Sequence, residues 1–383
     1  MKAQQDFPDL HLPQTLAESH STGVLPSQSL RAAIEREEIT ADQEISEEQI
    51  QPASLDLRLG DVAYRVRASF LPGRRCSVRQ RVKELAMHSV ELGDGAVLER
   101  DCVYVVPLVE RLNLSSNTSA IANPKSSTGR LDVFVRLITD YGLEFDQVGQ
   151  GYAGPLWVEV APRSFSILAR AGSRLMQLRL KRGSPRRTDV GLRRLHESVG
   201  LVDDASGPAD IKEGLLALSV DAVGTPSSDI VGFRAKKNTG LIDLEKVNQY
   251  EPDEFWEPIY SRVQKDIILS PNDFHILGSK EAVTVPLDHA AEMIAYDTLV
   301  GEFRVHYAGF FDPGFGHHDM GAAGTRAVLE VRSHEVPFVI EDGQIVGRLH
   351  YERLTERPDK LYGAAIGSSY QGQGLALSKQ FKR

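Results

Sequence analysis

Short apolar runs separated by turn-forming residues dominate the chain from Gln51 to about Arg182. They are rich in Val, Leu, Tyr and Phe, and Gly, Pro, Asn and Asp interrupt them; DVAYRVRASF, CVYVVPLVERL, LDVFVRLI, PLWVEVAP and SFSILAR are examples. Runs of this length with turn signals between them predict β-strands. Because many such strands follow one another, we expect a mainly β domain built as a barrel or a sandwich.

Changes of composition predict five segments. Residues 1–24 are polar, which predicts a mobile N-terminal arm or a segment that packs on a neighbouring subunit. We assign 25–182 to a first β-domain, 183–210 to a charged and weakly periodic linker, 211–354 to a second β-domain, and 355–383 to a C-terminal tail.

A short helix is expected at the start of the first domain. In SQSLRAAIEREEI, Leu30 and Ile34 stand four residues apart, as on one face of a helix. Ser27 precedes them and is a candidate N-cap.

An internal repeat relates the two β-rich blocks. EVAPRSFSILARAGSRLMQLRL begins at Glu159 and EVRSHEVPFVIEDGQIVGRLHY begins at Glu330, and in each a glycine, Gly172 or Gly343, follows 13 residues after the glutamate. A glutamate, two strands and a turn glycine in one register predict a duplicated β-domain.

Composition narrows the class of protein. A chain of 383 residues with 41% hydrophobic and 25% charged residues is long enough for two domains with real cores. The net charge of −9 argues against a nucleic-acid polymer as partner, although a local basic pocket for one small anion is compatible with it. Cys76 and Cys102 form neither a CxxC pair nor a His/Cys cluster, so we expect no structural zinc and no disulfide framework. Without an apolar signal core or a run of about 18 apolar residues, we expect a cytoplasmic protein without membrane partners.

Several segments of the chain resemble the dCTP deaminase family. PKSSTGRLDVFVRL at 124–137 resembles a basic-Ser-Ser-x-x-Arg motif, and GYAGPLWVEV at 151–160 resembles a strand that ends on the catalytic glutamate. VHYAGFFDPGFG followed by AVLEV resembles the substrate loop and its glutamate strand, LYGAAIGSSYQGQGL resembles the tail that closes over the triphosphate, and QPASLDLRLG at 51–60 resembles an early strand. The residues that match are Lys125, Ser126, Ser127, Arg130, Glu159, His306, Asp312, Phe315, Glu330, Tyr362, Tyr370 and Gln373.

This resemblance implies two fused dUTPase-like domains, each a distorted β-barrel or jelly roll with a few short helices. The two copies depart from the family pattern in complementary ways. Ala295, Tyr296, Asp297 and Val300 stand where the second copy would carry its Lys-Ser-Ser-Arg set, whereas the first copy has Arg136 in place of the family's histidine. In the family the site is shared between neighbouring subunits. Complementary loss therefore predicts one composite site per chain, at the domain interface or at an equivalent contact between chains of a homo-oligomer.

The implied reaction is hydrolytic deamination of dCTP to dUTP and ammonia, which feeds dUMP and dTTP synthesis. It needs an activated water and a proton for the leaving amine. The His-x-Glu and Pro-Cys-x-x-Cys signature of zinc deaminases is absent, so a buried glutamate with a raised pKa is expected to replace the metal. Glu330 is the first candidate for this role and Glu159 the second.

The resemblance also assigns roles around this glutamate. Arg130 would hold and aim the carboxylate, and Ser126 would position the water or donate to the developing charge. Lys125 and Ser127 would bind phosphate oxygens, while magnesium would arrive with the triphosphate and no zinc would be needed. Asp312 would accept from the sugar 3′-hydroxyl and Phe315 would pack on the deoxyribose or the base. His306, Tyr362, Tyr370 and Gln373 complete the expected substrate contacts, the last three as part of a glycine-rich lid.

Alternatives stay open from the sequence. A dUTP diphosphatase shares this fold, and GLID at 240–243 is a partial, badly positioned match to its motif. A bifunctional enzyme or a catalytically dead nucleotide-binding regulator is also compatible. His306 is as compatible with a core histidine, and Tyr362 with a packing arm. His317 and His318 resemble a metal pair, but adjacent residues on a glycine-rich loop are expected to point apart, which favours a solvated loop.

Overall fold

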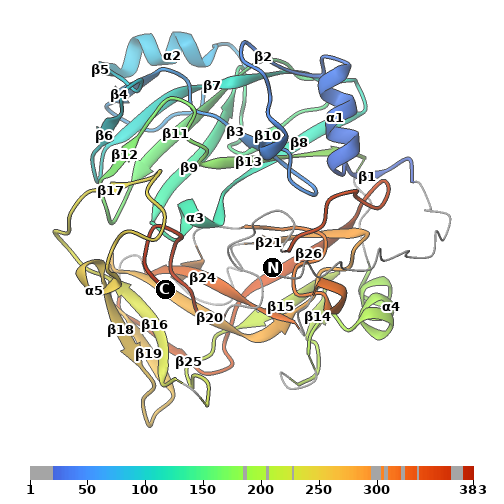
Figure 1. Ribbon diagram of the computed structural model, residues 1–383, viewed down its shortest axis with the longest axis vertical. Helices are drawn as coiled ribbons and strands as arrows, with labels where there is room; N and C mark the ends of the chain where they lie inside the picture. The colour runs from blue at the N-terminus through green and yellow to red at the C-terminus, as the bar shows by residue number, and fades with distance from the viewer. Residues whose placement is uncertain are drawn as a thin grey trace, which may run out of the picture.

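The structure is a computed structural model that describes residues 20–183, 188–203, 207–226, 228–294, 303–305, 309–320, 324–333, 336–363 and 374–383. Its described part consists mainly of β-strands arranged in two halves, one stacked on the other (Figure 1). The prediction of a mainly β fold is therefore confirmed. None of the helices in this part of the chain is long and apolar enough to cross a membrane.

The first half contains three small sheets. One has the order β1-β13-β8-β10, with β3 on β13; its strands are β1 (Gly23–Val24), β13 (Met176–Arg182), β8 (Thr118–Pro124), β10 (Gln147–Val148) and β3 (Leu55–Leu57). The second has the order β5-β4-β7-β11-β9, with β2 on β7; its strands are β5 (Ala86–Glu91), β4 (Val62–Val66), β7 (Val103–Asn113), β11 (Ala153–Pro162), β9 (Val133–Thr139) and β2 (Ile39–Ala41). The third has the order β17-β12-β6; its strands are β17 (Ile242–Asp243), β12 (Ile167–Ala169) and β6 (Ala96–Leu98).

The second half is built from three further sheets. The first is β14 (Ile211–Lys212), β15 (Leu215–Ser219), β26 (Ile345–Arg353), β21 (His289–Ile294) and β23 (Phe310–Phe311), in that order. The second is β18 (Trp256–Tyr260), β16 (Ile230–Ala235), β20 (Phe274–Val283), β24 (Thr325–Ser333) and β22 (Phe303–Val305), in that order. The third pairs β19 (Asp266–Leu269) with β25 (Phe338–Glu341).

The strand orders of the two halves repeat. The sheet β5-β4-β7-β11-β9 corresponds to β18-β16-β20-β24-β22, the run β13-β8-β10 corresponds to β26-β21-β23, and the pair β12-β6 corresponds to β25-β19. Gly172 and Gly343 precede the equivalent strands β13 and β26 with φ of +83° and +79°. This left-handed conformation favours glycine, which explains why the sequence repeat keeps one at that place. The duplication predicted from the sequence is thus visible in the topology.

Short helices connect the strands: α1 (Ser27–Glu35), α2 (Val78–Leu85), α3 (Ser126–Gly129), α4 (Asp189–Val199), α5 (Pro252–Phe255) and the 3-10 turns η1 (Glu47–Gln49) and η3 (His318–Met320). The expected helix after residue 25 is α1, but its N-cap is Pro26. The assignment of Ser27 as the cap was wrong, because its hydroxyl bonds the Asp359 carboxylate instead. Within the predicted linker, α4 forms a helix that Thr188 caps.

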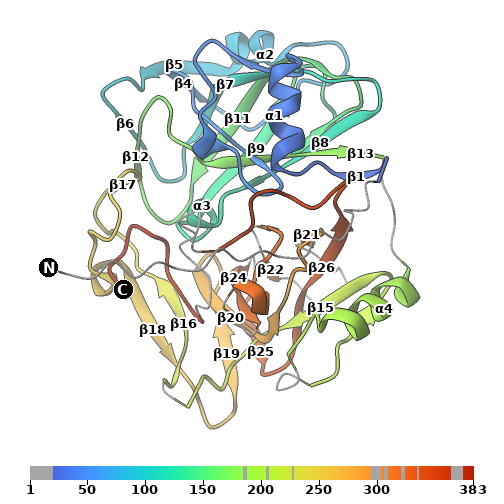
Figure 2. The same cartoon turned by 45° about the vertical axis from the view of Figure 1, so that its right-hand side comes forward.

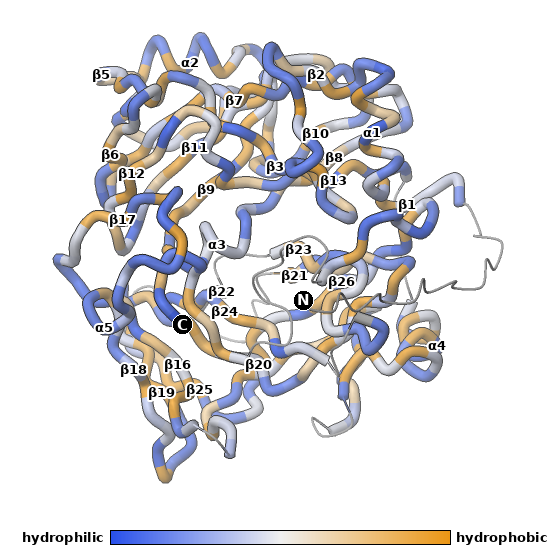
Figure 3. The backbone as a smooth tube through the Cα atoms, in the orientation of Figure 1, coloured by the Kyte–Doolittle hydropathy of each residue, from blue (hydrophilic) through white to orange (hydrophobic). Residues whose placement is uncertain are grey.

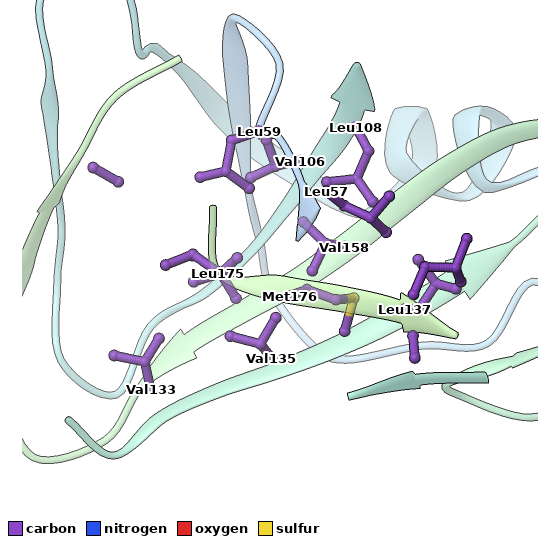
Figure 4. Packing of buried hydrophobic residues seen from close by; sticks show 14 of the residues in the cluster. Leu57, Leu59, Val106, Leu108, Val133, Val135, Leu137, Val158, Leu175 and Met176 are labelled. Carbon is purple, nitrogen blue, oxygen red and sulfur yellow. The ribbon is translucent and has the colours of Figure 1, made fainter. Parts of the chain in front are cut away.

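Two large apolar clusters fill the halves, as the hydropathy along the strands indicates (Figure 3). In the first, Val133, Val135 and Leu137 of β9 alternate inward and pack with Leu175 and Met176 (Figure 4). Burying such side chains is the main force that stabilises a fold of this kind.

The first cluster also crosses to the second half through aromatic rings. Phe165 contacts Trp256 at a centroid distance of 5.4 Å, and Trp256 contacts Phe381 at 5.9 Å. Tyr250 pairs in a parallel bridge with Phe381, so the C-terminal segment is held in the same place. The two halves are therefore joined through a common apolar core.

Candidate active site

The Ser-Ser-Thr-Gly turn forms α3, which lies where the two halves meet (Figures 1 and 2). The Lys125 carbonyl accepts from the Thr128 and Gly129 amides at 2.8 and 3.0 Å, and the Ser126 carbonyl accepts from the Arg130 amide at 3.0 Å. These bonds close a tight turn between β8 and β9. The turn holds the predicted motif residues at the boundary of the halves.

Glu330 lies on β24 of the second half, and only 5% of its surface is exposed. Along this strand Ala327, Leu329 and Val331 belong to the second core. Because side chains alternate in a strand, Glu330 faces the other way. Its Oε1 lies 4.0 Å from Nε of Arg130 in the first half. The structure therefore brings together the first candidate glutamate and the motif arginine within one chain.

Burial controls the protonation of this carboxyl. It raises the pKa of Glu330 from 4.5 to about 8, although the nearby Arg130 guanidinium acts in the opposite direction. A carboxyl that exchanges its proton near neutral pH can serve as a general base and then as a general acid.

Glu159 occupies the equivalent place on β11 of the first half, but its surroundings differ. Arg136 on the neighbouring strand β9 donates to Glu159 Oε1 from Nη2 at 2.6 Å and from Nε at 3.1 Å. The same guanidinium lies 3.5 Å from the ring centroid of Phe145. Arg136 thus binds this glutamate in a partly buried ion pair.

Lys125 and Ser126 also have identifiable neighbours. The Lys125 ammonium contacts the carboxylate of Asp56, a partner that the sequence analysis did not find. A Cβ on Gly309 would lie 3.9 Å from Ser126 Oγ, so Gly309, directly before β23 of the second half, lies close to that hydroxyl.

The C-terminal segment covers the motif turn. Ser378 Oγ donates to the Ser127 carbonyl at 2.7 Å, and Arg130 Nη1 donates to the Ala376 carbonyl at 3.1 Å. Lys379 follows directly, and its pKa is lowered by burial and by the charge of Lys125. Sequence reasoning missed Lys379, because the expected tail contacts ended at Gln373.

Asp312 is buried against an arginine from the first half. Arg179 on β13 is fully buried and approaches Asp312 Oδ1 with Nη2 at 3.4 Å. It also donates to the carbonyls of Ala53 and Ala291 at 3.3 and 3.0 Å, and its guanidinium lies 3.9 Å from the Phe310 ring centroid. Burial raises the pKa of Asp312, and Arg179 opposes that rise. The sequence places Arg179 between Leu178 and Leu180, but Gln177, Lys181 and Arg182 share the same strand, so no pattern distinguished it.

The predicted aromatic contacts lie together. Phe315 is 8% exposed and packs edge-on against Phe311 at 5.1 Å and against Tyr362 at 5.4 Å. The Tyr362 amide donates to the Pro313 carbonyl at 2.8 Å, which ties the start of the tail to the Asp312 loop. Packing of Phe315 on a sugar stays a prediction. His306, Tyr370 and Gln373 lie outside the described residues, as do residues 295–297 and 300.

The expectation that His317 and His318 point apart was wrong. Their rings stack at a centroid distance of 4.4 Å, and together with Asp319 they form a cluster of groups that could hold a metal. However, His317 Nδ1 already accepts from the Asp319 amide at 3.2 Å. His318 is largely exposed, as a solvated loop requires. The backbone bond and the exposure leave this cluster a poor metal site.

Two family models match the chain. The N-terminal domain model of 2′-deoxycytidine 5′-triphosphate deaminase matches residues 21–184, and the C-terminal domain model of the same enzyme matches residues 188–381. The chain belongs to the dCTP deaminase family. Its fold is that of a crystal structure of 2′-deoxycytidine 5′-triphosphate deaminase from Agrobacterium tumefaciens, with a TM-score of 0.82 and 49% identity over 88% of this chain and 100% of that one.

Other relatives carry related names. A protein from Halobacterium salinarum named "dCTP deaminase, dUMP-forming" is 32% identical over 127 residues, and a dCTP deaminase from Natronomonas pharaonis is 28% identical over 136 residues. These matches cover 32% and 34% of this chain, and 60% and 64% of those relatives' own lengths. The dCTP deaminase family membership agrees with the resemblance drawn from the motif turn and the glutamate strands.

Proposed function

We propose that this chain catalyses the hydrolytic deamination of dCTP to dUTP and ammonia. The observation that carries the proposal is the buried carboxyl of Glu330, which lies 4.0 Å from Arg130 where the two halves meet. Family membership supports the substrate, since both domain models describe a 2′-deoxycytidine 5′-triphosphate deaminase.

In the proposed mechanism, ionised Glu330 takes a proton from a water molecule, whose oxygen attacks C4 of the cytosine. Glu330 gives this proton to N3 of the ring, so the tetrahedral carbon carries the new hydroxyl and the amine. Glu330 then takes the proton of that hydroxyl and delivers it to the amine nitrogen, the C–N bond breaks, ammonia leaves and the C4 carbonyl of uracil forms. Arg130 aims the carboxylate and favours its ionised form, and Ser126 positions the water. The proposal uses no zinc.

Substrate binding follows the same division between the halves. Lys125 and Ser127 would bind phosphate oxygens, with Lys125 exchanging its contact with Asp56 for the substrate. Asp312, held by Arg179, would accept from the sugar 3′-hydroxyl, and Phe315 would line the sugar or base site. Magnesium would enter as part of the nucleotide. His306, Tyr362, Tyr370 and Gln373 would complete the contacts, as the resemblance implies.

A composite site of this kind needs both halves, so we propose one site per chain, built from Arg130 of the first half and Glu330 of the second. The proposal includes assembly of such chains into a homo-oligomer. Glu159 has no part in the reaction under this proposal, because it is paired with Arg136 and the proposed site uses Glu330.

A second function, the removal of pyrophosphate after deamination, is favoured by one observation. The Halobacterium salinarum relative is named as dUMP-forming. One assay separates the possibilities: the full-length protein is incubated with dCTP and magnesium, and the products are resolved by chromatography. We expect dUTP and ammonia; dUMP with pyrophosphate would assign the bifunctional reaction, and unchanged dCTP would overturn both and leave a nucleotide-binding regulator.

The structure offers a matched pair of variants for this assay. Glu330→Gln and Glu159→Gln make the same change at equivalent positions of the two halves. We expect deamination to be abolished by the first and kept by the second. The composite-site proposal would be wrong if only Glu159→Gln were inactive.

A further inference from the structure

A polar cavity lies between the two halves, and none of the residues assigned to the reaction lines it. Its volume is about 290 Å³. The first half contributes the loop before β7 and the segment after β11, and the second half contributes the end of β16, the turn before β20 and one residue of β24. Its size is near the lower end of small-molecule sites and far too small for a polymer.

The lining of this cavity is strongly basic. Five cations line it, namely Arg100, Arg163, Lys236, Lys237 and Arg332, together with only two carboxylates, Asp101 and Asp273. The chain as a whole carries a net charge of −9, so this positive excess is local. Opposed cations from two halves in one cavity predict an anionic ligand.

Each carboxylate of the cavity is shared between two cations. Asp101 lies 3.5 Å from Arg100 and 3.8 Å from Arg163, both in the first half. Asp273 lies 3.1 Å from Lys237 and 3.9 Å from Arg234 in the second half. One carboxylate cannot neutralise both of its neighbouring cations, so positive charge is left on the first-half wall and on the second-half wall of the cavity.

The fifth cation is fixed and buried. The side chain of Arg332 is 8% exposed, and its guanidinium contacts the carboxylate of Asp132, the carbonyl of Asn272 and, at 3.4 Å, the hydroxyl of Ser164. These contacts fix the orientation of the planar guanidinium group of Arg332. Arginine held in this way suits the oxygens of a phosphate group.

We infer that this cavity binds the pyrophosphate group of a small phosphorylated molecule. Five cations face the carboxylates Asp101 and Asp273 of the lining and Asp132, the partner of Arg332, so an excess of two positive charges remains, one on each side of the cavity. A diphosphate can place one phosphate group against each side, which a single phosphate cannot do. The free anion and a nucleotide share this chemistry. The inference does not rest on the proposed deamination, since it uses different residues.

The test is calorimetric titration of the full-length chain with inorganic pyrophosphate. The titration uses the Lys125→Ala variant, which lacks the cation expected to bind the substrate phosphates, because dCTP added to fill the active site would itself bring a pyrophosphate group to the cavity. We expect one binding event that weakens as salt is added. The result does not depend on whether the chain deaminates dCTP.

Variants then locate the binding event. Arg163→Ala with Lys237→Ala removes one cation from each wall and leaves Arg100 and Arg234 beside the two carboxylates, and we expect affinity to fall at least tenfold. Arg81→Ala with Lys83→Ala removes the same charges from the helix α2 and should leave the affinity unchanged. Equal affinity in all proteins, or no binding to the parent protein, would overturn the inference.

Two further ligands define what the cavity recognises. Orthophosphate should bind more weakly than pyrophosphate, and equal affinity would overturn the assignment of a diphosphate. ADP and dCDP separate the two sources of the group. Tighter binding of a nucleoside diphosphate than of pyrophosphate supports a nucleotide ligand, and the reverse supports the free anion.

Discussion

The protonation of Glu330 gives a quantitative prediction for catalysis. With the pKa raised from 4.5 to about 8, about one tenth of the carboxyls are ionised at pH 7 and about nine tenths at pH 9. If the ionised form is the general base, kcat/KM for dCTP should rise about tenfold between these two pH values. The measurement is ammonia release at low dCTP concentration, at constant ionic strength and saturating magnesium, because kcat/KM reports the pKa of the free enzyme.

Arg130 supplies an internal control for this pH profile. Its guanidinium lowers the pKa of Glu330 against the effect of burial. Arg130→Met should therefore move the half-rise of kcat/KM to a higher pH, in addition to lowering the rate. Glu159→Gln should leave the profile where it is. A kcat/KM that is flat from pH 7 to 9, or a half-rise near pH 4.5, would refute the assignment of Glu330 as the base.

Four further outcomes can be measured. Glu330→Gln should melt at a higher temperature than the parent protein at pH 9 but not at pH 4.5. The carboxyl of Glu330 loses its proton near pH 4.5 in the unfolded chain and near pH 8 in the folded chain. The stability of the parent protein therefore falls between these two pH values. Arg136→Met should destabilise the fold by about 2–3 kcal/mol in calorimetry, since it leaves the Glu159 carboxylate buried without its ion pair; an unchanged melting temperature would show that the pair contributes nothing. Arg179→Met should lower the melting temperature and raise the KM for dCTP through Asp312, with Arg179→Lys restoring part of both; a KM equal to that of the parent would remove Asp312 from substrate binding. Exhaustive chelation of zinc should leave the rate of ammonia release unchanged, and its loss would contradict the zinc-free proposal.

Local pattern was enough to predict the duplication and the motif turn. Gly172 and Gly343 keep their register because the backbone needs a left-handed residue before β13 and β26. The turn from Lys125 to Arg130 is likewise local, since its own backbone hydrogen bonds close it. Patterns of this kind are readable from one sequence because the interacting residues are close along the chain.

The partners of the site residues were not predictable in the same way. Asp56 is distant from Lys125 along the chain and meets it when the strands of the first half pack, and Arg179 meets Asp312 only after the two halves pack. Arg179 stands among other polar residues of β13, so neither its burial nor its partner could be read from the sequence. Ser27 shows the same limit, because a cap position and a long-range bond to Asp359 look alike in sequence.

The repeated strand order also bears on how this protein can change. When identical subunits form a ring, every substitution appears at all equivalent positions at once. Here Glu159 and Glu330 occupy equivalent strands of one chain, yet each can mutate alone. A substitution of Arg136 or Glu159 therefore leaves Glu330 unchanged, whereas in a ring of identical subunits it would alter every copy of that glutamate. A well-packed apolar pair of similar volume could replace the Arg136–Glu159 pair, and exchanges of that kind are often neutral or stabilising. The first half can therefore lose its glutamate while it still places Arg130 beside Glu330.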